Sequence, residues 1–167
     1  MGLFGPLRYV LLTDALLENL TPVQVEAVMA HELAHVRRRH MLWLGIAALG
    51  SIGLINILCE VLLRRADASW AATEWARGGA GVVSVVLGLV LFGFVSRRFE
   101  WQADAFAAQH LSGYRAAAGP QSTPITSDAV LAMCGALATV AQFNHIPMSR
   151  FTWRHGSIAD RRRRLER

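Results

Sequence analysis

The apolar positions of the chain are concentrated in two nearly uninterrupted blocks. The first covers residues 41–63, where Glu60 is the only charged residue, and the second covers residues 78–96, which are rich in glycine and valine. A helix rises about 1.5 Å per residue, so the first block is about 35 Å long and the second is just long enough to cross a bilayer. We predict a transmembrane helical hairpin with both outer ends on one side. The alternative is a buried core helix, although so long an apolar run rarely stays buried in so small a domain.

Upstream of these blocks, the pattern predicts a short strand or hairpin and a long helix. Residues 8–13 are rich in residues that favour strands, and residues 14–19 can form a helical turn. Thr21 is a good N-cap for the next helix, with Pro22 at its first position and Gln24 completing a capping box.

We expect this long helix to extend from residue 22 to about residue 40. Its buried side is predicted to consist of four apolar residues: Val25, Val28, Met29 and Val36.

Downstream, the second block should continue as a helix to about residue 111. A loop rich in glycine and proline follows over residues 112–126, then a helix over residues 128–143 and a short basic helix over residues 158–167.

These elements predict one domain, residues 1–167, of mainly α-helical class. Residues 1–40 supply the strand and the long helix, residues 41–96 the transmembrane hairpin, and residues 97–167 the C-terminal helices.

Composition and charge support a membrane location. Hydrophobic residues make up 53% of the chain and charged residues 17%, which is below the usual quarter or so. A net charge of +5 is compatible with nucleic-acid binding, but the arginines flank the apolar blocks and the C-terminus without interleaved aromatic residues. We therefore expect a lipid bilayer as partner and no nucleic acid.

The distribution of arginine predicts the orientation of the hairpin. Five arginines lie at the outer ends of the hairpin and three in the loop that joins its helices, which favours outer ends in the cytoplasm. The outer set is Arg37, Arg38, Arg39, Arg97 and Arg98, and the loop set is Arg64, Arg65 and Arg77.

The two cysteines, Cys59 and Cys134, have no metal-site spacing and are expected to be buried free thiols.

The segment His31-Glu32-Leu33-Ala34-His35 lies within the predicted long helix. Residues four apart share one face of a helix, so the imidazoles of His31 and His35 can bind one ion. Glu32 lies beside them, where its carboxylate can act as a general base on a water molecule. His-Glu-x-x-His is the zinc-hydrolase pattern, although so short a pattern also occurs by chance in ordinary helices.

A catalytic zinc site usually has three protein ligands. His40 is unsuitable as the third, because on one continuous helix it lies half a turn away from His31. Arg38 and Met41 exclude the longer zinc pattern that has glycine and histidine at those positions.

Glu100 is the better candidate for the third ligand. His35 lies six residues before the first block and Glu100 four residues after the second, so the hairpin would bring both within about 10 Å of one membrane face. Asp104 lies one turn beyond Glu100, where it can accept a hydrogen bond from a ligand histidine. The alternative is that Glu100 and Asp104 lie on a solvated helix face and pair with Arg97 or Arg98. The presence of the His-Glu-x-x-His segment favours the ligand interpretation over this alternative.

Three segments of the chain resemble the sequence signatures of a known protein family. The first consists of residues 12–17, 20–21 and 30–36 with Arg39 and His40. The second consists of residues 96–98 with Glu100, Ala103 and Asp104, and the third is His155-Gly156-Ser157 followed by Arg161 and Leu165. In this order they resemble the signatures of the HtpX and CAAX prenyl protease family of integral-membrane zinc peptidases. The third signature of that family is His-Pro-x-x-x-x-Arg, so Gly156 replaces the usual proline.

The resemblance implies a membrane-anchored, zincin-like catalytic domain with one zinc ion per chain. It implies that His31, His35 and Glu100 are the ligands and that Glu32 is the catalytic base.

The resemblance also implies a role for His155 in contacting the substrate or the oxyanion, the alternative being an ordinary loop histidine. Arg161 would be structural or near the site, or else part of a solvated basic face at residues 161–164.

The function implied is an endopeptidase that cleaves misfolded or damaged membrane proteins at the cytoplasmic face of the bacterial inner membrane. Its partners would be protein or peptide substrates and the bilayer. One alternative is the processing of a specific lipidated or signal-bearing substrate, which needs an enclosing chamber. Another is a non-catalytic membrane scaffold with a vestigial zinc site, against which the intact base and ligands argue.

Overall fold

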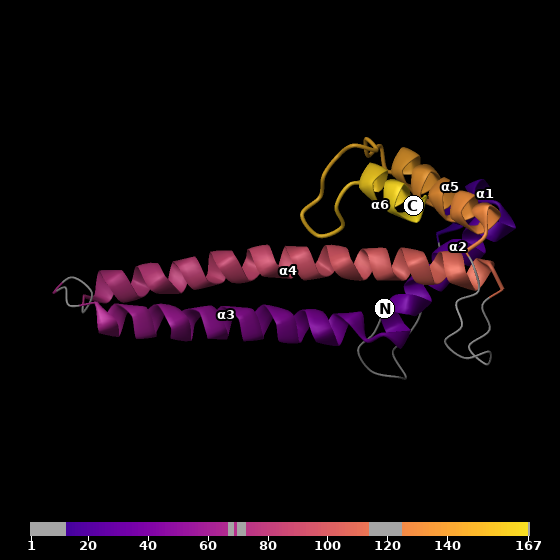
Figure 1. Cartoon of the computed structure of the whole chain (residues 1–167). Helices are drawn as coiled ribbons and strands as arrows, with labels where there is room; N and C mark the ends of the chain where they lie inside the picture. Colours follow the sequence, from indigo (N-terminus) through magenta and orange to yellow (C-terminus); the bar gives the residue numbers. More distant parts are fainter. Residues whose placement is uncertain (1–12, 67–68, 70–72, 114–124, 167) are drawn as a thin grey trace. The chain divides into compact units, whose positions relative to one another are not determined.

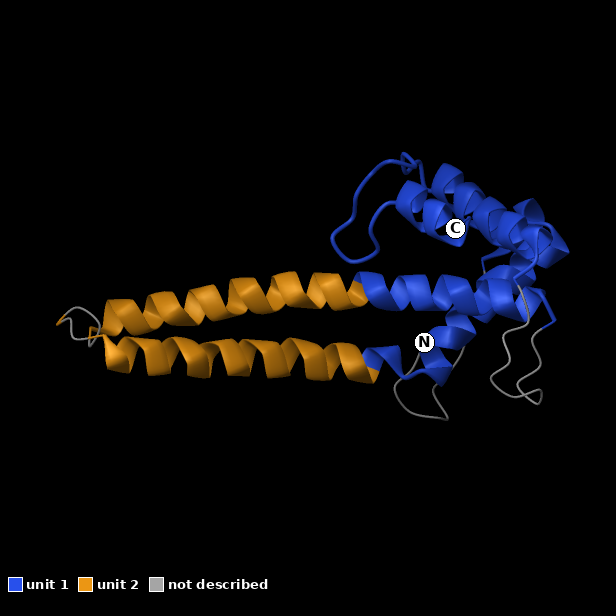
Figure 2. Cartoon of the chain, in the orientation of Figure 1, with its two compact units in different colours: residues 1–41, 97–167 blue, residues 42–96 orange. Residues whose placement is uncertain are grey.

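The structure is a computed structural model that describes residues 13–66, 69, 73–113 and 125–166. The chain divides into two compact units, one formed by residues 1–41 with residues 97–167 and the other by residues 42–96 (Figure 2). The strand predicted over residues 8–13 lies outside the described residues except for Thr13, so it stays a prediction.

The described residues are mainly helical, which confirms the predicted class (Figure 1). The one β feature among them is an isolated bridge between Thr152 and Gly156. The six helices of this part of the chain are α1 (Asp14–Asn19), α2 (Pro22–Arg37), α3 (His40–Arg65), α4 (Glu74–Leu111), α5 (Ser127–Phe143) and α6 (Ile158–Leu165).

The start of α2 is as predicted, but its end is not. The backbone N–H of Gln24 donates to Oγ1 of Thr21 at 3.3 Å, and the N–H of Thr21 donates to Oε1 of Gln24 at 3.0 Å, which confirms the capping box. The predicted extension to residue 40 is wrong, because α2 ends at Arg37. Arg39 has a φ of 53°, a left-handed conformation that interrupts the helix, and α3 begins at His40.

The core of the first unit is built largely from small side chains. The predicted buried side of α2 is confirmed only in part, because Val25 and Val28 are half-buried against the core cluster whereas Met29 is exposed. The buried residues of α2 are instead Ala27, Ala30, His31 and Ala34. Alanine at these positions lets neighbouring helices approach closely, and the larger apolar residues surround the contact. The core cluster consists of Leu20, Ala27, Ala30, Ala107, Met133, Ala136 and Leu137.

Helix α5 packs against both α2 and α6. Thr126 caps α5 by accepting a hydrogen bond from the N–H of Ala129, and Ser157 caps α6 by accepting one from the N–H of Asp160. These caps define where the two C-terminal helices begin.

The second unit contains the apolar parts of α3 and α4, which run side by side in opposite directions (Figure 2). Among the described residues, these two helices are long and apolar enough to cross a membrane, by length and composition. In the most apolar 18-residue stretch of each helix, the share that is buried within the chain is 0% for α3 and 17% for α4. The alternative of a buried core helix is therefore wrong. Cys59 on α3 is half-buried, whereas Cys134 on α5 is buried, and both thiols are free.

Gly88 on α4 packs tightly against Ile52 on α3. A Cβ atom at Gly88 would overlap Cγ1 of Ile52, whereas a Cβ at Gly81 on the same helix would meet no atom within 4 Å. We expect Gly88→Ala to lower the melting temperature in detergent, because overpacking costs about 1–3 kcal/mol. Gly81→Ala should instead raise it, because alanine stabilises a helix interior by about 0.5–1 kcal/mol. Thermal unfolding followed by circular dichroism tests this pair, and shifts of the same sign would contradict the contact.

Candidate metal centre

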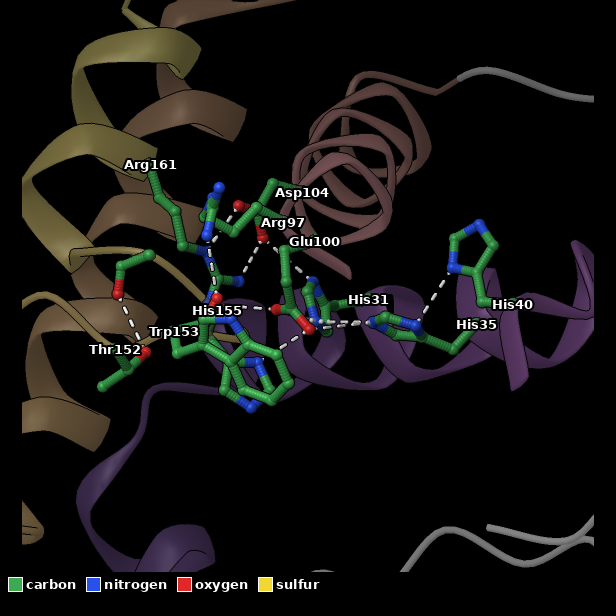
Figure 3. Close-up of polar contacts among 11 residues, drawn as sticks. His31, His35, His40, Arg97, Glu100, Asp104, Thr152, Trp153, His155 and Arg161 are labelled. Atoms are coloured by element: carbon green, nitrogen blue, oxygen red, sulfur yellow. Dashed lines mark hydrogen bonds and ion pairs between the residues drawn. The ribbon is translucent and has the colours of Figure 1, made fainter. Parts of the chain in front are cut away.

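Helix α2 presents two imidazoles to one point. Nε2 of His31 and Nε2 of His35 lie 3.2 Å apart, with the two rings edge to face (Figure 3). This arrangement follows from the four-residue spacing on a regular helix. Two nitrogens that face each other at this distance are well placed to bind one cation between them.

Helix α4 contributes Glu100 to the same point. Glu100 is 7% exposed, and its Oε2 lies 3.7 Å from Nε2 of His31 and its Oε1 3.9 Å from Nε2 of His35. One ligand atom from each of the three residues lies within 4.8 Å of the others. Ligands at about 2.0–2.2 Å from a tetrahedral zinc ion lie roughly 3.3–3.6 Å from one another, so the observed spacing fits such a site.

Asp104 lies on the far side of the His31 ring. Its Oδ1 is 2.9 Å from Nδ1 of His31, and Asp104 is only 1% exposed. A proton on Nδ1 leaves Nε2 as the unprotonated nitrogen, which is the form that binds a metal. The structure therefore places Asp104 where it favours the metal-binding tautomer of His31.

Arg161 on α6 joins the two carboxylates. Its guanidinium donates from Nε and Nη2 to the two oxygens of Asp104 at 2.7 and 2.6 Å, and Nη1 lies 3.2 Å from Oε2 of Glu100 (Figure 3). Burial alone would raise the pKa of Asp104, but the hydrogen bonds from Arg161 and His31 outweigh it and hold that pKa below its usual value. Burial also favours a higher pKa for Glu100, and His155 and Arg161 reverse this effect.

The charge of this cluster favours a cation. Two buried carboxylates face one buried guanidinium, so with neutral histidines the group carries a net negative charge. An uncompensated buried charge is costly. A divalent cation between His31, His35 and Glu100 would offset it, and the imidazole and carboxylate donors suit zinc.

His155 lies in the segment between α5 and α6. Its Nδ1 is 2.9 Å from Oε1 of Glu100, and its side chain is 51% exposed, so it reaches both the cluster and solvent. Nη1 of Arg97 donates to the carbonyl of Trp153 at 2.9 Å, which helps to hold this segment. Gly156 has a φ of 74°, which proline cannot adopt because its ring fixes φ near −65°. The departure from the usual His-Pro sequence thus coincides with a different backbone conformation.

Glu32 lies beside His31 on α2 and is half-buried. Among the described residues, the carboxylate of Glu32 forms no hydrogen bond or ion pair. Its negative charge is one of those that raise the pKa of Arg161 against the effect of burial, Asp104 and Glu100 being the stronger contributors. Glu32 is therefore near the cluster, with a carboxylate available to bind water.

The sequence-predicted residues His31, His35, Glu100, Asp104 and His155 all meet at this cluster. The alternative of a solvated face for the two carboxylates is wrong, since both are buried. A solvated position is also wrong for Arg161, which is buried, although Arg163 and Arg164 are exposed.

The sequence excluded His40 as a ligand but did not predict its contact with His35, in which the two Nδ1 atoms lie 3.0 Å apart. The expected continuous helix hid this contact, because it would point the two rings in different directions. Only a helix break at Arg39 would have predicted this contact, and arginine is not a residue type that indicates a break.

Such a His-His-Glu cluster, with a glutamate beside the first histidine on the histidine helix, is typical of metallopeptidases that carry the His-Glu-x-x-His pattern. Residues 1–123 match the model of peptidase family M48, and the chain belongs to this family. The predicted HtpX-like relationship is thereby confirmed.

Several proteins named "Protease HtpX homolog" are similar to the chain. One from Bacteroides fragilis is 29% identical over 112 residues, covering 60% of this chain and 34% of the relative. One from Neisseria meningitidis is 34% identical over 109 residues, covering 58% and 37%. "Protease HtpX homolog 2" from Methanosarcina mazei is 33% identical over 109 residues, covering 59% and 35%. The matches thus span about a third of the length of these relatives, and no solved structure matches the chain.

Removal of Arg161 should be strongly destabilising. Arg161→Met leaves Asp104 and Glu100 buried without their cation, and breaking a buried pair in this way costs about 3–5 kcal/mol. Arg163→Met is the matched control, because Arg163 is exposed and pairs with Asp160 on the same helix. Denaturant unfolding in detergent should show a large loss for the first variant and little change for the second. Equal losses would contradict the role of the buried pair.

The metal-free protein should lose stability as the pH falls from about 6.5 to 4. Burial, with the nearby charge of His31, lowers the pKa of His35 from 6.5 to about 4. In this interval the unfolded chain gains a proton at His35 that the folded protein does not, so the free energy of unfolding falls by on the order of 2–3 kcal/mol. Above pH 6.5 this residue contributes no pH dependence. Melting temperatures at pH 7 and pH 5 should therefore differ less in His35→Gln than in the wild type, and identical differences would contradict the shift.

Proposed function

We propose that this chain carries the catalytic site of a membrane-embedded zinc endopeptidase. The observation that carries the proposal is the convergence of His31, His35 and Glu100, with Glu32 beside them, in a member of peptidase family M48. The three convergent residues would hold one zinc ion per chain. Zinc bound there would supply Lewis-acid polarisation of the scissile carbonyl and a water molecule of lowered pKa.

Glu32 is the proposed general base. Its carboxylate takes a proton from the attacking water as the water oxygen bonds to the peptide carbonyl carbon. The same proton then passes to the leaving amine as the carbon–nitrogen bond breaks. One water is consumed, and a carboxyl and an amino end are formed. The absence of Glu32 from the hydrogen bonds of the cluster supports this role, because its oxygens remain available to water.

His155 is proposed to stabilise the oxyanion. With Nδ1 donating to Glu100, a protonated His155 still has Nε2–H for a second acceptor, and half of the side chain is exposed toward solvent. Such a donor is worth a few kcal/mol in the transition state. Asp104 would act through His31 by holding its ring and its tautomer.

We further propose that the substrates are misfolded or damaged membrane proteins, cleaved at the cytoplasmic face of the bacterial inner membrane. The support is the pair of apolar helices together with the excess of arginine at their outer ends. In the sequence, the proposed ligands His35 and Glu100 lie within six residues of the two apolar blocks. This short separation favours a reaction near the membrane surface over one in bulk solution.

Replacement of Glu32 by glutamine should abolish proteolysis while leaving the metal site intact. Casein cleavage in mild detergent with added zinc should fall by a factor of about 10² or more in Glu32→Gln, the usual contribution of a general base. Zinc content, measured on the same samples, should stay at one ion per chain in both proteins.

Equal cleavage by both proteins would contradict Glu32 as the base. No cleavage by either protein, with zinc bound in both, would favour the non-catalytic scaffold.

A further inference from the structure

His40 is buried beside the metal centre without contributing to the convergent donor set. It is 1% exposed, and its Nδ1 lies 3.0 Å from Nδ1 of His35 (Figure 3). The other nitrogen of His35, Nε2, faces His31 and Glu100. The two nitrogens of the His35 ring therefore have separate tasks, one toward the candidate metal and one toward His40.

A hydrogen bond between two imidazole nitrogens requires one proton shared between a donor and an acceptor. When Nε2 of His35 provides its lone pair to a metal, the proton of the neutral ring is on Nδ1. Nδ1 of His40 must then be the acceptor, which assigns the His40 proton to Nε2. His40 thus matches the position of Asp104 at His31, but it adds no negative charge to a cluster that already contains two buried carboxylates.

The backbone is shaped to bring the two rings together. Five residues apart on a continuous helix, His35 and His40 would point about 140° away from each other. The end of α2 and the left-handed conformation of Arg39, φ 53°, turn His40 back toward His35. A bulky residue at positive φ is strained, and such strain often marks a functional constraint.

Phe99 fixes the plane of the His40 ring. The two rings are stacked with centroids 4.3 Å apart and an interplanar angle of 3°. Phe99 directly precedes Glu100 on α4, so one turn of this helix supplies a ligand to the site and a platform for His40. The planes of the His35 and His40 rings are nearly perpendicular, at 85°, and the Nδ1 atoms of the two rings are the atoms in contact.

We propose that His40 is a positioning residue that holds the His35 imidazole with Nε2 directed into the metal site. This inference rests on the proposed metal site, and it assigns to His40 no contact with metal or substrate. A purely structural His40 would need only to fill buried space against Phe99, whereas a positioning His40 must present a hydrogen-bond acceptor at the location of Nδ1.

Two amide variants separate these roles. His40→Asn places its carbonyl oxygen near the location of Nδ1, whereas His40→Gln places it near that of Nε2, beyond the reach of His35. Both variants are polar and similar in size, so a loss from burying an amide affects both. His40→Leu removes the acceptor altogether, and its metal-free melting temperature reports whether the fold survives.

We would measure the zinc affinity of the full chain and of each variant in detergent, by competition with a chromophoric chelator. The visible spectrum of each cobalt-loaded protein would be recorded as a second measurement. Loss of such an outer partner of a metal ligand typically costs 10–100-fold in affinity. We expect a loss of this size in His40→Leu and His40→Gln, with most of the affinity restored in His40→Asn. The cobalt spectrum of His40→Asn should resemble that of the wild type, and the other two spectra should differ from it.

Equal affinities in the Asn and Gln variants would overturn the positioning role and leave the metal site standing. Wild-type affinity in His40→Leu would do the same. Failure of the wild-type chain to bind zinc or cobalt would overturn the proposed function, and the role of His40 with it.

Discussion

The buried pairing of Arg161 with Asp104 and Glu100 is the interaction on which the arrangement of the site depends. Each charge is removed from water, and each would cost several kcal/mol if it were left alone. Because the guanidinium is planar and binds Asp104 through two hydrogen bonds, it fixes the direction as well as the position of that carboxylate. The same guanidinium contacts Oε2 of Glu100, and His155 contacts the other oxygen, Oε1, so both oxygens of this carboxylate are also fixed.

From this pairing, constraints extend toward His31 and His35. Asp104 holds the outer nitrogen of His31, and His40 lies at the outer nitrogen of His35. In each case the ring is fixed at the nitrogen that faces away from the convergent point, which leaves Nε2 directed inward. A site that is oriented before a cation binds loses less conformational freedom on binding, which is the physical benefit of such outer contacts.

Small residues make this arrangement possible. Ala27, Ala30 and Ala34 occupy the buried face of α2, and Ala103 and Ala107 are fully buried on α4. Short side chains at these positions allow the helices to lie close enough for Nδ1 of His31 to come within 2.9 Å of Oδ1 of Asp104. Larger apolar residues would separate them by the width of a side chain, so the valines of α2 are displaced to the margin of the core.

The sequence by itself determined the local features of this protein. The capping box of Thr21 and Gln24, the two apolar helices and the shared face of His31 and His35 follow from interactions between residues no more than a few positions apart. Tertiary structure alone decided the partners of the charged residues, because Arg161 and Asp104 are 57 positions apart and no periodicity links them. It also decided the break at Arg39, where packing outweighs the tendency of an arginine-rich segment to continue a helix. For that reason the shared helix face of His31 and His35 was predictable from their four-residue spacing, whereas the contact of His40 with His35 appeared only in the folded protein.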